Sequence, residues 1–424
     1  GFVATRTTRT GSLRSEEEVT EMYKSFDVAR SKPEVDPTSA GGFTPPKALM
    51  FHAIYRNPGG EEQSFANESK LLKSIGYETV QCTNENSKIS RGPWAAVTAV
   101  FSPRVLVDAL RIIRSERPDV IYVNNLWPAF SASLLVALRA AAIPTLQAVR
   151  NYRLATPSAK LRADGTCTEC GSTKYFTSCV RNGCYGNSRL QSLVCYLSAT
   201  AVKLSVFGWK QHRFVATSAM TARLVEGRLI SSGRVVVRPN FGFEENEPEF
   251  RSTDSVVCVS RLTPEKGVLD LVRNWPQGAG SPSLTVLGDG PQYGEISSIS
   301  AALDNVTLAG FTSHEDVIEI LRDSAASVVP SQWAEPFGRV AIESMSVGTP
   351  VIYATNGALA DIVGPGGTPL HTLEESSIRE ALDRIFGADD RSAIRRSAYR
   401  HYSNRFTSRK AATSMRELID EVRS

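Results

Sequence analysis

The chain has 424 residues, of which 42% are hydrophobic and 22% charged, and its formal net charge is +4. This length allows two or three domains with substantial cores, and the composition is that of a globular protein. No apolar run approaches the roughly 20 residues of a membrane-spanning helix, and the modest charge does not favour nucleic acid as a partner. The start lacks the apolar region of a signal peptide. The seven cysteines, an odd number, fit a reducing compartment better than a disulfide framework. We therefore expect a cytoplasmic location.

Residues 1–46 are rich in Ser, Thr, Arg, Glu and Pro. This composition predicts a poorly ordered N-terminal extension, with one short helical pattern from Glu16 to Phe26. An arm that binds a partner protein is the alternative interpretation of this segment.

Residues 47–240 alternate between apolar strands and helical stretches. Strands are predicted at 48–55, 79–82, 120–123, 145–149, 214–217 and 235–237. A polar linker, 244–253, leads into a second alternation over 241–405. Its strands are predicted at 256–259, 284–287, 306–309, 327–329 and 351–353. Residues 406–424 form a last helix that we expect to pack back on the first domain.

This alternation predicts an α/β protein with two Rossmann-like domains, each a mostly parallel sheet covered by helices. Ligands of such sheets bind outside the carboxyl ends of the strands. A ligand is therefore expected in a cleft between the two domains.

The segment Glu335-Pro-Phe-Gly-Arg-Val-Ala-Ile-Glu343 is the most informative part of the chain. A short apolar strand precedes it, and a helix that ends at Gly348 follows. We expect Glu343 inside this apolar helix, where an unpaired charge is costly, so that hydroxyl groups of a ligand would satisfy it. Glu335 precedes the helix, where backbone N–H groups can bind an anion. The pattern indicates a ligand that is part sugar and part phosphate.

Three glycine-containing loops also follow predicted strands. Gly59 and Gly60 would let the backbone approach a ligand, although such a pair is often only a turn. Arg261 and Lys266 share one loop, where they suit a diphosphate or are simply solvated cations. The loop 287–291 is too short for a dinucleotide fingerprint, which argues against a nicotinamide dehydrogenase, and a P-loop is absent as well.

Together these segments resemble the retaining GT-B glycosyltransferases of family four. The resemblance rests on 259–267, 287–291, 308–311 and, above all, 330–351, and it extends over most of the chain from about residue 48. It implies a GT-B fold, with two Rossmann-like domains facing a central cleft. It also implies transfer of a sugar from a nucleotide-diphosphate sugar, of UDP or GDP type, to a hydroxyl acceptor.

The same resemblance implies roles for individual residues. Arg261 and Lys266 would hold the diphosphate, Glu343 the ribose hydroxyls, and Glu335 the hydroxyls of the transferred sugar. The remaining residues of the donor site would be Gly59, Gly60, Pro336, Phe337 and Gly338. No catalytic metal is expected, and the anomeric configuration would be retained by front-side attack. A glycosidase with two catalytic carboxylates is disfavoured, because Glu343 beside cations would be a poor proton donor.

One position departs from the family pattern. Arg150, in Val149-Arg-Asn-Tyr-Arg153, stands where such transferases often carry a His that contacts the donor sugar, and Asn124 stands where another His is common. We expect Arg150 either to remake the sugar contact as a catalytic residue or, together with Arg153, to bind an anionic acceptor. Impaired catalysis is the third possibility.

Four cysteines lie within an insertion predicted at 165–186, in the pattern Cys167-x2-Cys170 and Cys179-x4-Cys184. Four thiolates at this spacing suit a structural zinc ion, and two disulfides or free thiols are the alternatives. A closed four-cysteine site would be structural, and it would brace the loop 154–162 as a wall of the acceptor site.

The acceptor is expected to be a sugar, a glycan or a lipid-linked molecule on the N-terminal domain. The apolar stretch 190–207, flanked by cations, could contact a membrane surface or be a core helix with solvated ends. Two other functions stay open: a catalytically silent nucleotide-sugar binder and a sugar-nucleotide epimerase of the same fold. The cysteine cluster lacks the basic and aromatic run that would favour a nucleic-acid binder.

Overall fold

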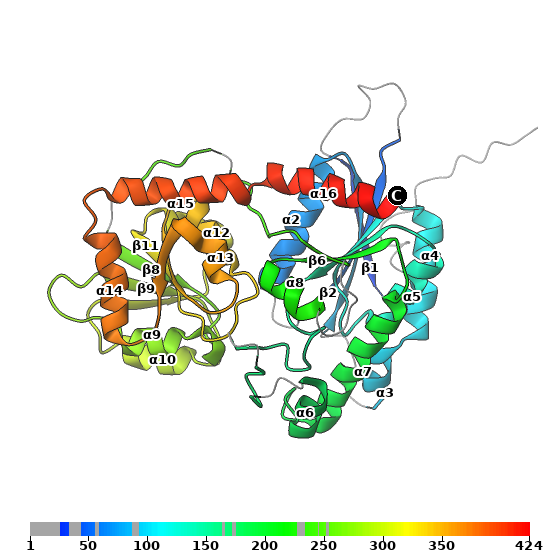
Figure 1. Ribbon diagram of the computed structural model, residues 1–424, viewed down its shortest axis with the longest axis horizontal. Coiled ribbons are helices and arrows are strands. Elements are labelled where there is room, and N and C mark those ends of the chain that lie inside the picture. The colour runs from blue at the N-terminus through cyan, green and yellow to red at the C-terminus, as the bar shows by residue number, and fades with distance from the viewer. Residues whose placement is uncertain are drawn as a thin grey trace, which may run out of the picture.

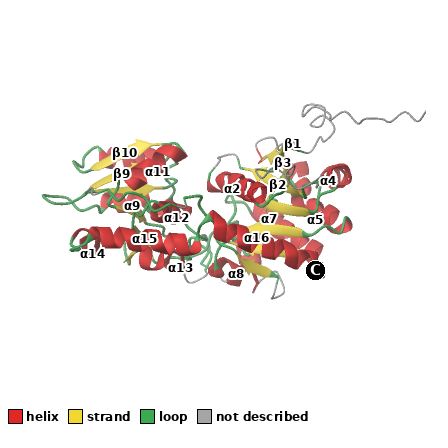
Figure 2. Ribbon diagram, turned by 90° about the horizontal axis from the view of Figure 1, so that it is seen from above, coloured by secondary structure: helices red, strands yellow, loops and turns green. Residues whose placement is uncertain are grey.

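The computed structural model describes residues 26–33, 44–55, 59–86, 93–162, 166–171, 175–226, 234–244, 246–251 and 254–424. In this part of the chain two α/β domains lie side by side, each with a sheet between layers of helices (Figures 1 and 2). This is the fold class that the sequence predicts. None of the described helices combines the length and the apolar character that a membrane crossing requires.

The N-terminal domain contains a seven-stranded sheet in the order β1-β3-β2-β4-β5-β6-β7, parallel except for β1. Its strands are β1 (Asp27–Ser31), β2 (Lys47–Ile54), β3 (Glu78–Glu85), β4 (Val120–Asn125), β5 (Thr145–Val149), β6 (His212–Ala216) and β7 (Val235–Val237). Its helices are α2 (Gly60–Ser74), α3 (Pro93–Val100), α4 (Pro103–Glu116), α5 (Ser131–Ala140), α6 (Tyr175–Asn182), α7 (Arg189–Val206) and α8 (Ala219–Glu226).

Both faces of this sheet are buried, as its nearly continuous apolar strands predict. On one face Leu49 and Phe51 of β2 pack with side chains of α4, α5 and α7. On the other face Met50 packs with side chains of α2 and of the C-terminal helix α16 (Ser408–Arg423). Successive residues of a strand point to opposite faces, so one strand supplies both cores.

The C-terminal domain contains a six-stranded parallel sheet in the order β10-β9-β8-β11-β12-β13. Its strands are β8 (Ser255–Val259), β9 (Ser283–Leu287), β10 (Val306–Gly310), β11 (Ala326–Val329), β12 (Val351–Ala354) and β13 (Gly367–Leu370). Its helices are η3 (Pro264–Lys266), α9 (Val268–Arg273), α10 (Tyr293–Ser300), α11 (His314–Arg322), α12 (Arg339–Ser346), α13 (Leu359–Val363), η4 (Gly364–Gly366), α14 (Glu375–Phe386) and α15 (Arg391–Arg405). Neither η4 nor β13 was predicted from the sequence.

The last two helices connect the domains along one side of the molecule (Figure 1). α15 buries Tyr402 in the C-terminal domain, beside side chains of α12 and α13. The chain then crosses to the N-terminal domain, where α16 buries Met415 and Ile419 under the sheet. The end of the chain is therefore part of the first domain's core.

The extension predicted for residues 1–46 needs a correction, because β1 lies within it. β1 pairs antiparallel with β3 and forms the edge of the sheet. Phe26 packs against Phe51 and Phe130, with ring centroids 6.0 and 5.9 Å apart. Five residues of alternating pattern in a polar segment are too short a signal, and only the tertiary contacts stabilise this strand. The helical pattern predicted at 16–26 lies outside the described residues, apart from Phe26.

Candidate functional site

Two loops of the C-terminal domain meet at one edge of its sheet. The first follows β8 and contains Arg261 and Lys266; the second follows β11 and contains Glu335. β8 and β11 are parallel neighbours, so their carboxyl ends lie at the same edge. Gly267 has a φ of 70°, and a Cβ there would lie 2.2 Å from the carbonyl oxygen of Pro330. A glycine is thus required for the two loops to touch.

Glu335 is the best satisfied carboxylate at this edge. Its Oε2 accepts hydrogen bonds from Lys266 Nζ at 2.7 Å, Trp333 Nε1 at 2.9 Å and Ser331 Oγ at 3.0 Å. The side chain is buried. Burial alone would raise its pKa, but Lys266 and the other two donors outweigh this effect and hold the pKa of Glu335 below its usual range. Glu335 is therefore a fixed anion, held by Lys266.

Arg261 differs from Lys266, although it lies in the same loop. Its side chain is exposed, and it forms no ion pair with any described residue. The loop 287–291 contacts the loop that carries Arg261, because the N–H of Leu262 donates to the carbonyl of Asp289 at 2.9 Å. Arg261 is thus a cation presented to solvent on a loop whose backbone is held in place.

Glu343 does not occupy the environment expected from the sequence. It lies on the partly exposed side of α12 and not on the buried face. Arg339 Nη2 donates to its Oε1 at 2.8 Å, one helical turn away. The expectation that Glu343 would be unpaired within an apolar helix is therefore wrong. The reason is the helix period, which places residues four apart on the same face and brings the two charges together.

Gly59 and Gly60 lie at the start of α2, and they face α12 of the other domain. Arg339 Nη1 lies 3.0 Å from Ser64 Oγ and 3.5 Å from the carbonyl oxygen of Gly60. The glycine pair and the helix that follows residue 338 thus meet across the boundary between the domains. The sequence pattern did not single out Arg339, although its position four residues before Glu343 was a usable signal.

The residues between Glu335 and α12 connect the two domains in a second place. The carbonyl oxygen of Pro336 accepts hydrogen bonds from Ser218 Oγ at 2.7 Å and from Thr221 Oγ1 at 3.3 Å. Phe337 is buried in the core of the C-terminal domain. Among the described residues, the N–H groups of Phe337 and Gly338 donate to no backbone carbonyl outside the helices. These donors are therefore free for an anion at the start of α12.

The side chain of Arg150 is largely buried and held by hydrogen bonds within the domain, although the residue also lines the hollow described below. Its Nε donates to Asn124 Oδ1 at 2.9 Å, and its Nη2 donates to Glu68 Oε1 and Tyr122 Oη, both at 3.1 Å. Its Nη1 donates to the side-chain oxygen of Asn240. Glu68 also forms a buried ion pair with a second arginine, Arg238. The guanidinium thus connects β4, β5 and α2 inside the domain, and this explains why an Arg is tolerated there.

A hollow of about 660 Å³, which includes space open to solvent, lies at the carboxyl ends of β4 and β5. Arg153 lies in its wall, 4.4 Å from the ring of Trp127, and its Nε and Nη1 have no hydrogen-bond partner in the described structure. Glu61 of α2 also lines it and accepts a hydrogen bond from Asn151 Nδ2 at 3.1 Å. Burial raises the pKa of Glu61, against the opposing effect of Asn151 and the nearby arginines. Sequence reasoning missed Glu61, although it follows the glycine pair directly.

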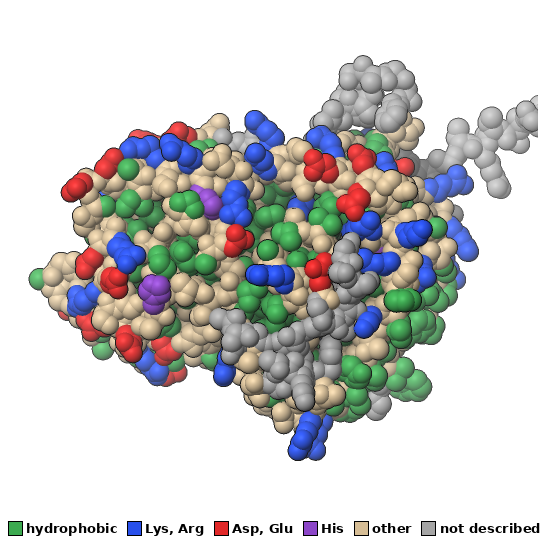
Figure 3. Space-filling view, in the orientation of Figure 1, with side chains coloured by type: hydrophobic (Ala, Val, Ile, Leu, Met, Phe, Trp, Pro, Cys, Tyr) green, Lys and Arg blue, Asp and Glu red, His purple; other side chains and the backbone are tan. Residues whose placement is uncertain are grey.

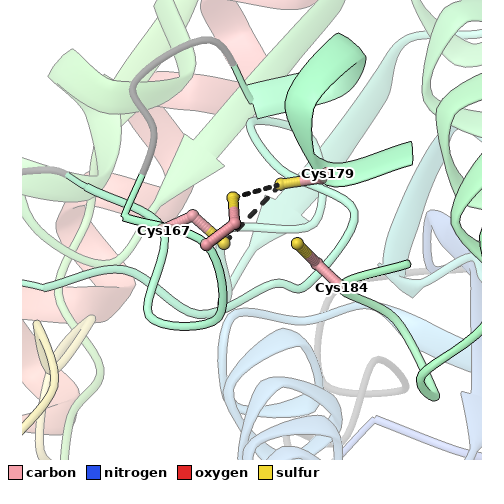
Figure 4. Close-up of side chains that lie close together, drawn as sticks. Cys167, Cys179 and Cys184 are labelled. Atoms are coloured by element: carbon pink, nitrogen blue, oxygen red, sulfur yellow. Dashed lines mark hydrogen bonds between the residues drawn. The ribbon is translucent and has the colours of Figure 1, made fainter. Parts of the chain in front are cut away.

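The four cysteines of the insertion lie together, as their spacing predicts. The sulfur atoms of Cys167, Cys170, Cys179 and Cys184 are all within 4.8 Å of one another, and none forms a disulfide. Figure 4 shows the labelled side chains converging from the chain before α6 and from the end of α6 onward.

Comparison with known proteins gives a family match for one part of the chain. Residues 243–399 match the model of the family described as glycosyl transferases group 1. Over 159 residues, 36% of the chain, the sequence is 26% identical to an uncharacterized glycosyltransferase of Methanocaldococcus jannaschii. Over 151 residues, 34% of the chain, it is 28% identical to a glycogen synthase of Mycobacterium tuberculosis. These matches span 39% and 36% of the length of the two relatives.

The fold comparison covers much more of the chain. The Anabaena protein HepE, solved with UDP and also with UDP-glucose, superposes with a TM-score of 0.59 at 17% identity. The match covers 88% of this chain and 99% of that protein. This likeness, with the two facing α/β domains, establishes a GT-B fold, and the group 1 domain coincides with the C-terminal half that carries Glu335 and Lys266.

Proposed function

We propose that the protein is a glycosyltransferase that moves a sugar from a nucleotide-diphosphate sugar to a hydroxyl acceptor. The observation that carries the proposal is the meeting of the Arg261–Lys266 loop with the Glu335 loop at the start of α12. An exposed arginine, an anchored lysine and unpaired N–H groups together suit a diphosphate. The matched group 1 domain and the UDP bound to the Anabaena protein support the same ligand class.

In this proposal Glu335 positions the transferred sugar and does not exchange protons. Its lowered pKa and its three donors keep it ionised, so that it can accept hydrogen bonds from sugar hydroxyls. Arg261, Lys266 and the start of α12 would stabilise the charge that develops on the departing diphosphate. Retention of configuration by front-side attack, and transfer without a catalytic metal, complete the proposed mechanism.

The donor proposal is tested by thermal shift with UDP- and GDP-linked sugars, because a bound donor raises the melting temperature by mass action. Arg261→Ala is the informative variant, since this side chain forms no ion pair in the described structure and its loss should leave the free protein unchanged. We expect the donor-induced shift to fall in Arg261→Ala and to persist in Arg384→Ala, a control on the outer helix α14. No shift with any nucleotide sugar would overturn the proposal.

The reaction itself is followed by NMR of the donor and of the products. A transferase releases the nucleoside diphosphate and forms a glycoside with the donor's anomeric configuration, with or without EDTA. Interconversion of the donor without release would indicate an epimerase of the same fold. Binding without any turnover in the presence of acceptors would indicate a silent nucleotide-sugar binder.

The acceptor is proposed to enter the hollow beside Glu61 and Arg153. Two unpartnered guanidinium nitrogens, the aromatic face of Trp127 and a carboxylate provide donors, an apolar platform and an acceptor for a sugar or an anionic glycan. The hollow lies in the domain that faces the donor site, beside the glycine pair of α2.

We also propose that a face of the N-terminal domain rests on an anionic membrane, where a lipid-linked acceptor would be found. Large apolar side chains are exposed on α3, on α7 and directly after α7: Trp94 is 77%, Leu204 67% and Phe207 72% exposed. Neither helix carries an acidic residue, whereas Arg189 and Lys203 of α7 are exposed cations. Apolar side chains gather over α3 and α7 at the lower right of Figure 3. Apolar contact with nearby cations is the pattern of a surface that binds anionic lipid.

Flotation with vesicles tests this surface. The protein should float with phosphatidylglycerol vesicles more than with phosphatidylcholine vesicles, and the double variant Leu204→Ser, Phe207→Ser should lose this binding. Phe311→Ser, which removes an exposed side chain of the other domain, is the control. Unchanged flotation of the double variant would contradict a membrane contact. A wild-type protein that is a dimer, together with a double variant that is a monomer, would also contradict it, because the apolar face would then be a contact between two copies. A cytoplasmic location belongs to the same proposal, supported by the seven unpaired thiols.

A further inference from the structure

The spacing of the four sulfur atoms in the cysteine insertion is that of a tetrahedral metal site. A zinc ion bound to four thiolates at about 2.3 Å requires sulfur–sulfur distances of about 3.8 Å. The sulfur of Cys179 lies 3.6 Å from that of Cys167 and 3.8 Å from that of Cys170. A disulfide would need about 2.05 Å. The four thiols therefore form a preshaped cage. Figure 4 shows Cys167, Cys179 and Cys184 close together in it.

The surroundings of the cage suit bound thiolates. Ser158 Oγ lies 3.3 Å from the sulfur of Cys167, and Thr156 Oγ1 lies 3.6 Å from that of Cys179. Hydroxyl groups at these positions can donate to a thiolate, and such outer contacts orient metal ligands. Cys167 and Cys179 are fully buried. All four corners are cysteines, so no position stays open for a substrate, and the site is structural.

The loop that precedes the insertion, residues 152–162, lies against the donor domain at the segment that contains Glu335, and Cys167 and Cys179 belong to the same apolar cluster. The ring of Tyr152 packs edge-on against Trp333 at 6.1 Å, and the N–H of Ala334 donates to the carbonyl of Leu161 at 2.7 Å. Leu161 in turn forms an isolated bridge with Cys167. Trp333, through its Nε1, is one of the three donors to Glu335.

A second contact joins the same two parts of the chain. Lys160 Nζ lies 3.2 Å from Glu265 Oε2, in the loop that carries Lys266. Lys266 and Glu335 are thus each one residue from a contact with the 152–162 loop, which precedes the cysteine insertion. A rigid insertion would hold both at once.

We propose that Cys167, Cys170, Cys179 and Cys184 bind one zinc ion as four thiolates, and that this site fixes the 152–162 loop against the donor-binding segment 332–335. Each thiol loses its proton to solvent when the ion binds, and no oxidation occurs. The ion would thus act as a brace between the acceptor-side domain and the carboxylate of the donor site.

Metal analysis of the full chain, purified without added zinc, tests the first part. We expect about one zinc per chain, loss of the metal in Cys167→Ser and in Cys184→Ser, and full content in Cys82→Ala, a buried cysteine of β3. After denaturation with a chelator, all seven thiols should react with an alkylating reagent. Wild-type protein that holds no metal and shows two disulfides by mass would overturn the proposal, as would equal zinc in wild type and in both serine variants.

Hydrogen–deuterium exchange tests the brace. Removal of the ion from the wild-type chain with a chelator should speed amide exchange at 159–162 and at 332–335, whereas α4, on the far side of the first domain, should not change. Unchanged exchange at 332–335 would overturn the coupling. Neither measurement depends on donor binding or on turnover, so a failure here is distinct from a failure of the transferase proposal.

Discussion

Arg339 Nη1 lies 3.0 Å from Ser64 Oγ, so that the start of α12 in one domain is hydrogen-bonded to the first turns of α2 in the other. The same guanidinium holds Glu343 at 2.8 Å. Glu343, which the family resemblance assigns to the ribose, is therefore connected through one side chain to the glycine pair of the facing domain. A donor that engaged Glu343 would have to share or replace this contact.

The Arg339 contact predicts an energetic coupling between the domains. Ser64→Ala should lower the free energy of unfolding by about 1 kcal/mol, the usual net value of one hydrogen bond. Arg339→Ala should cost more, about 1.5 to 3 kcal/mol, because Glu343 also loses its cation. In urea unfolding, the double variant should lose less than the sum of the two single losses, although Ser64 Oγ also donates to the carbonyl of Gly60. Full additivity of the two losses would show that the side chains do not interact in solution.

Glu335→Gln should destabilise the protein and change its acid sensitivity. Breaking a buried ion pair from one side typically costs about 3 to 5 kcal/mol, since Lys266 loses its partner. The folded pKa of Glu335 lies below its ordinary value of 4.5, so its stabilising effect is complete above pH 4.5 and is lost as the pH falls through the folded pKa. The unfolding free energy of wild type should therefore fall more steeply below pH 4.5 than that of the variant. Parallel curves for the two proteins would contradict this assignment.

Arg150→Ala should reduce stability more than it affects recognition of a ligand. Removal of this buried cation takes a partner from Glu68 and a hydrogen-bond donor from the side-chain oxygens of Asn124 and Tyr122, at a cost of about 3 to 5 kcal/mol. Arg153→Ala is the comparison, because two of its nitrogens have no partner. It should raise the KM for the acceptor with a smaller loss of melting temperature. An Arg150→Ala protein of normal melting temperature and low kcat would restore the catalytic role.

The buried side chain of His212 should give the free energy of unfolding a second pH dependence, at a higher pH than that of Glu335. Burial, with Arg234 and Arg213 nearby, lowers the pKa of His212 to about 3. The unfolded chain takes up a proton near pH 6.5 whereas the folded chain does not, so the unfolding free energy falls as the pH falls below 6.5. Between pH 7 and pH 5 this residue accounts for about 2 kcal/mol. In His212→Gln the loss over this range should be smaller by that amount, whereas His371→Gln, at an exposed site, should match wild type.

Glu61→Gln separates acceptor binding from donor binding. The substitution keeps the shape of the side chain that lines the hollow but removes its capacity to ionise. We expect the KM for the acceptor to rise by about tenfold, equivalent to one hydrogen bond of about 1.4 kcal/mol, with an unchanged thermal shift by the donor. An equal loss of donor and acceptor binding would place Glu61 outside the acceptor site.

Patterns of local spacing allowed most of the fold to be predicted. Apolar strands separated by helices predict two parallel sheets, and all six predicted N-terminal strands and all five predicted C-terminal strands are present within a few residues of their expected limits. The glycines, prolines and charges of the 335–343 segment likewise predict a helix start beside an anion site. β1 and β13 were missed because short edge strands depend on the neighbours that cover them.

The amino-acid sequence by itself determined the two domains, the 335–343 segment as a candidate anion site and the four cysteines as one cluster, because each follows from residues close together in the chain. Only the tertiary structure decided which charged side chains are paired and which are buried. It paired Glu343 with Arg339, and it buried Arg150 among Glu68, Asn124 and Tyr122, which lie 26 to 82 residues away. Whether a charge is costly depends on which distant groups pack around it, and sequence spacing does not contain that information.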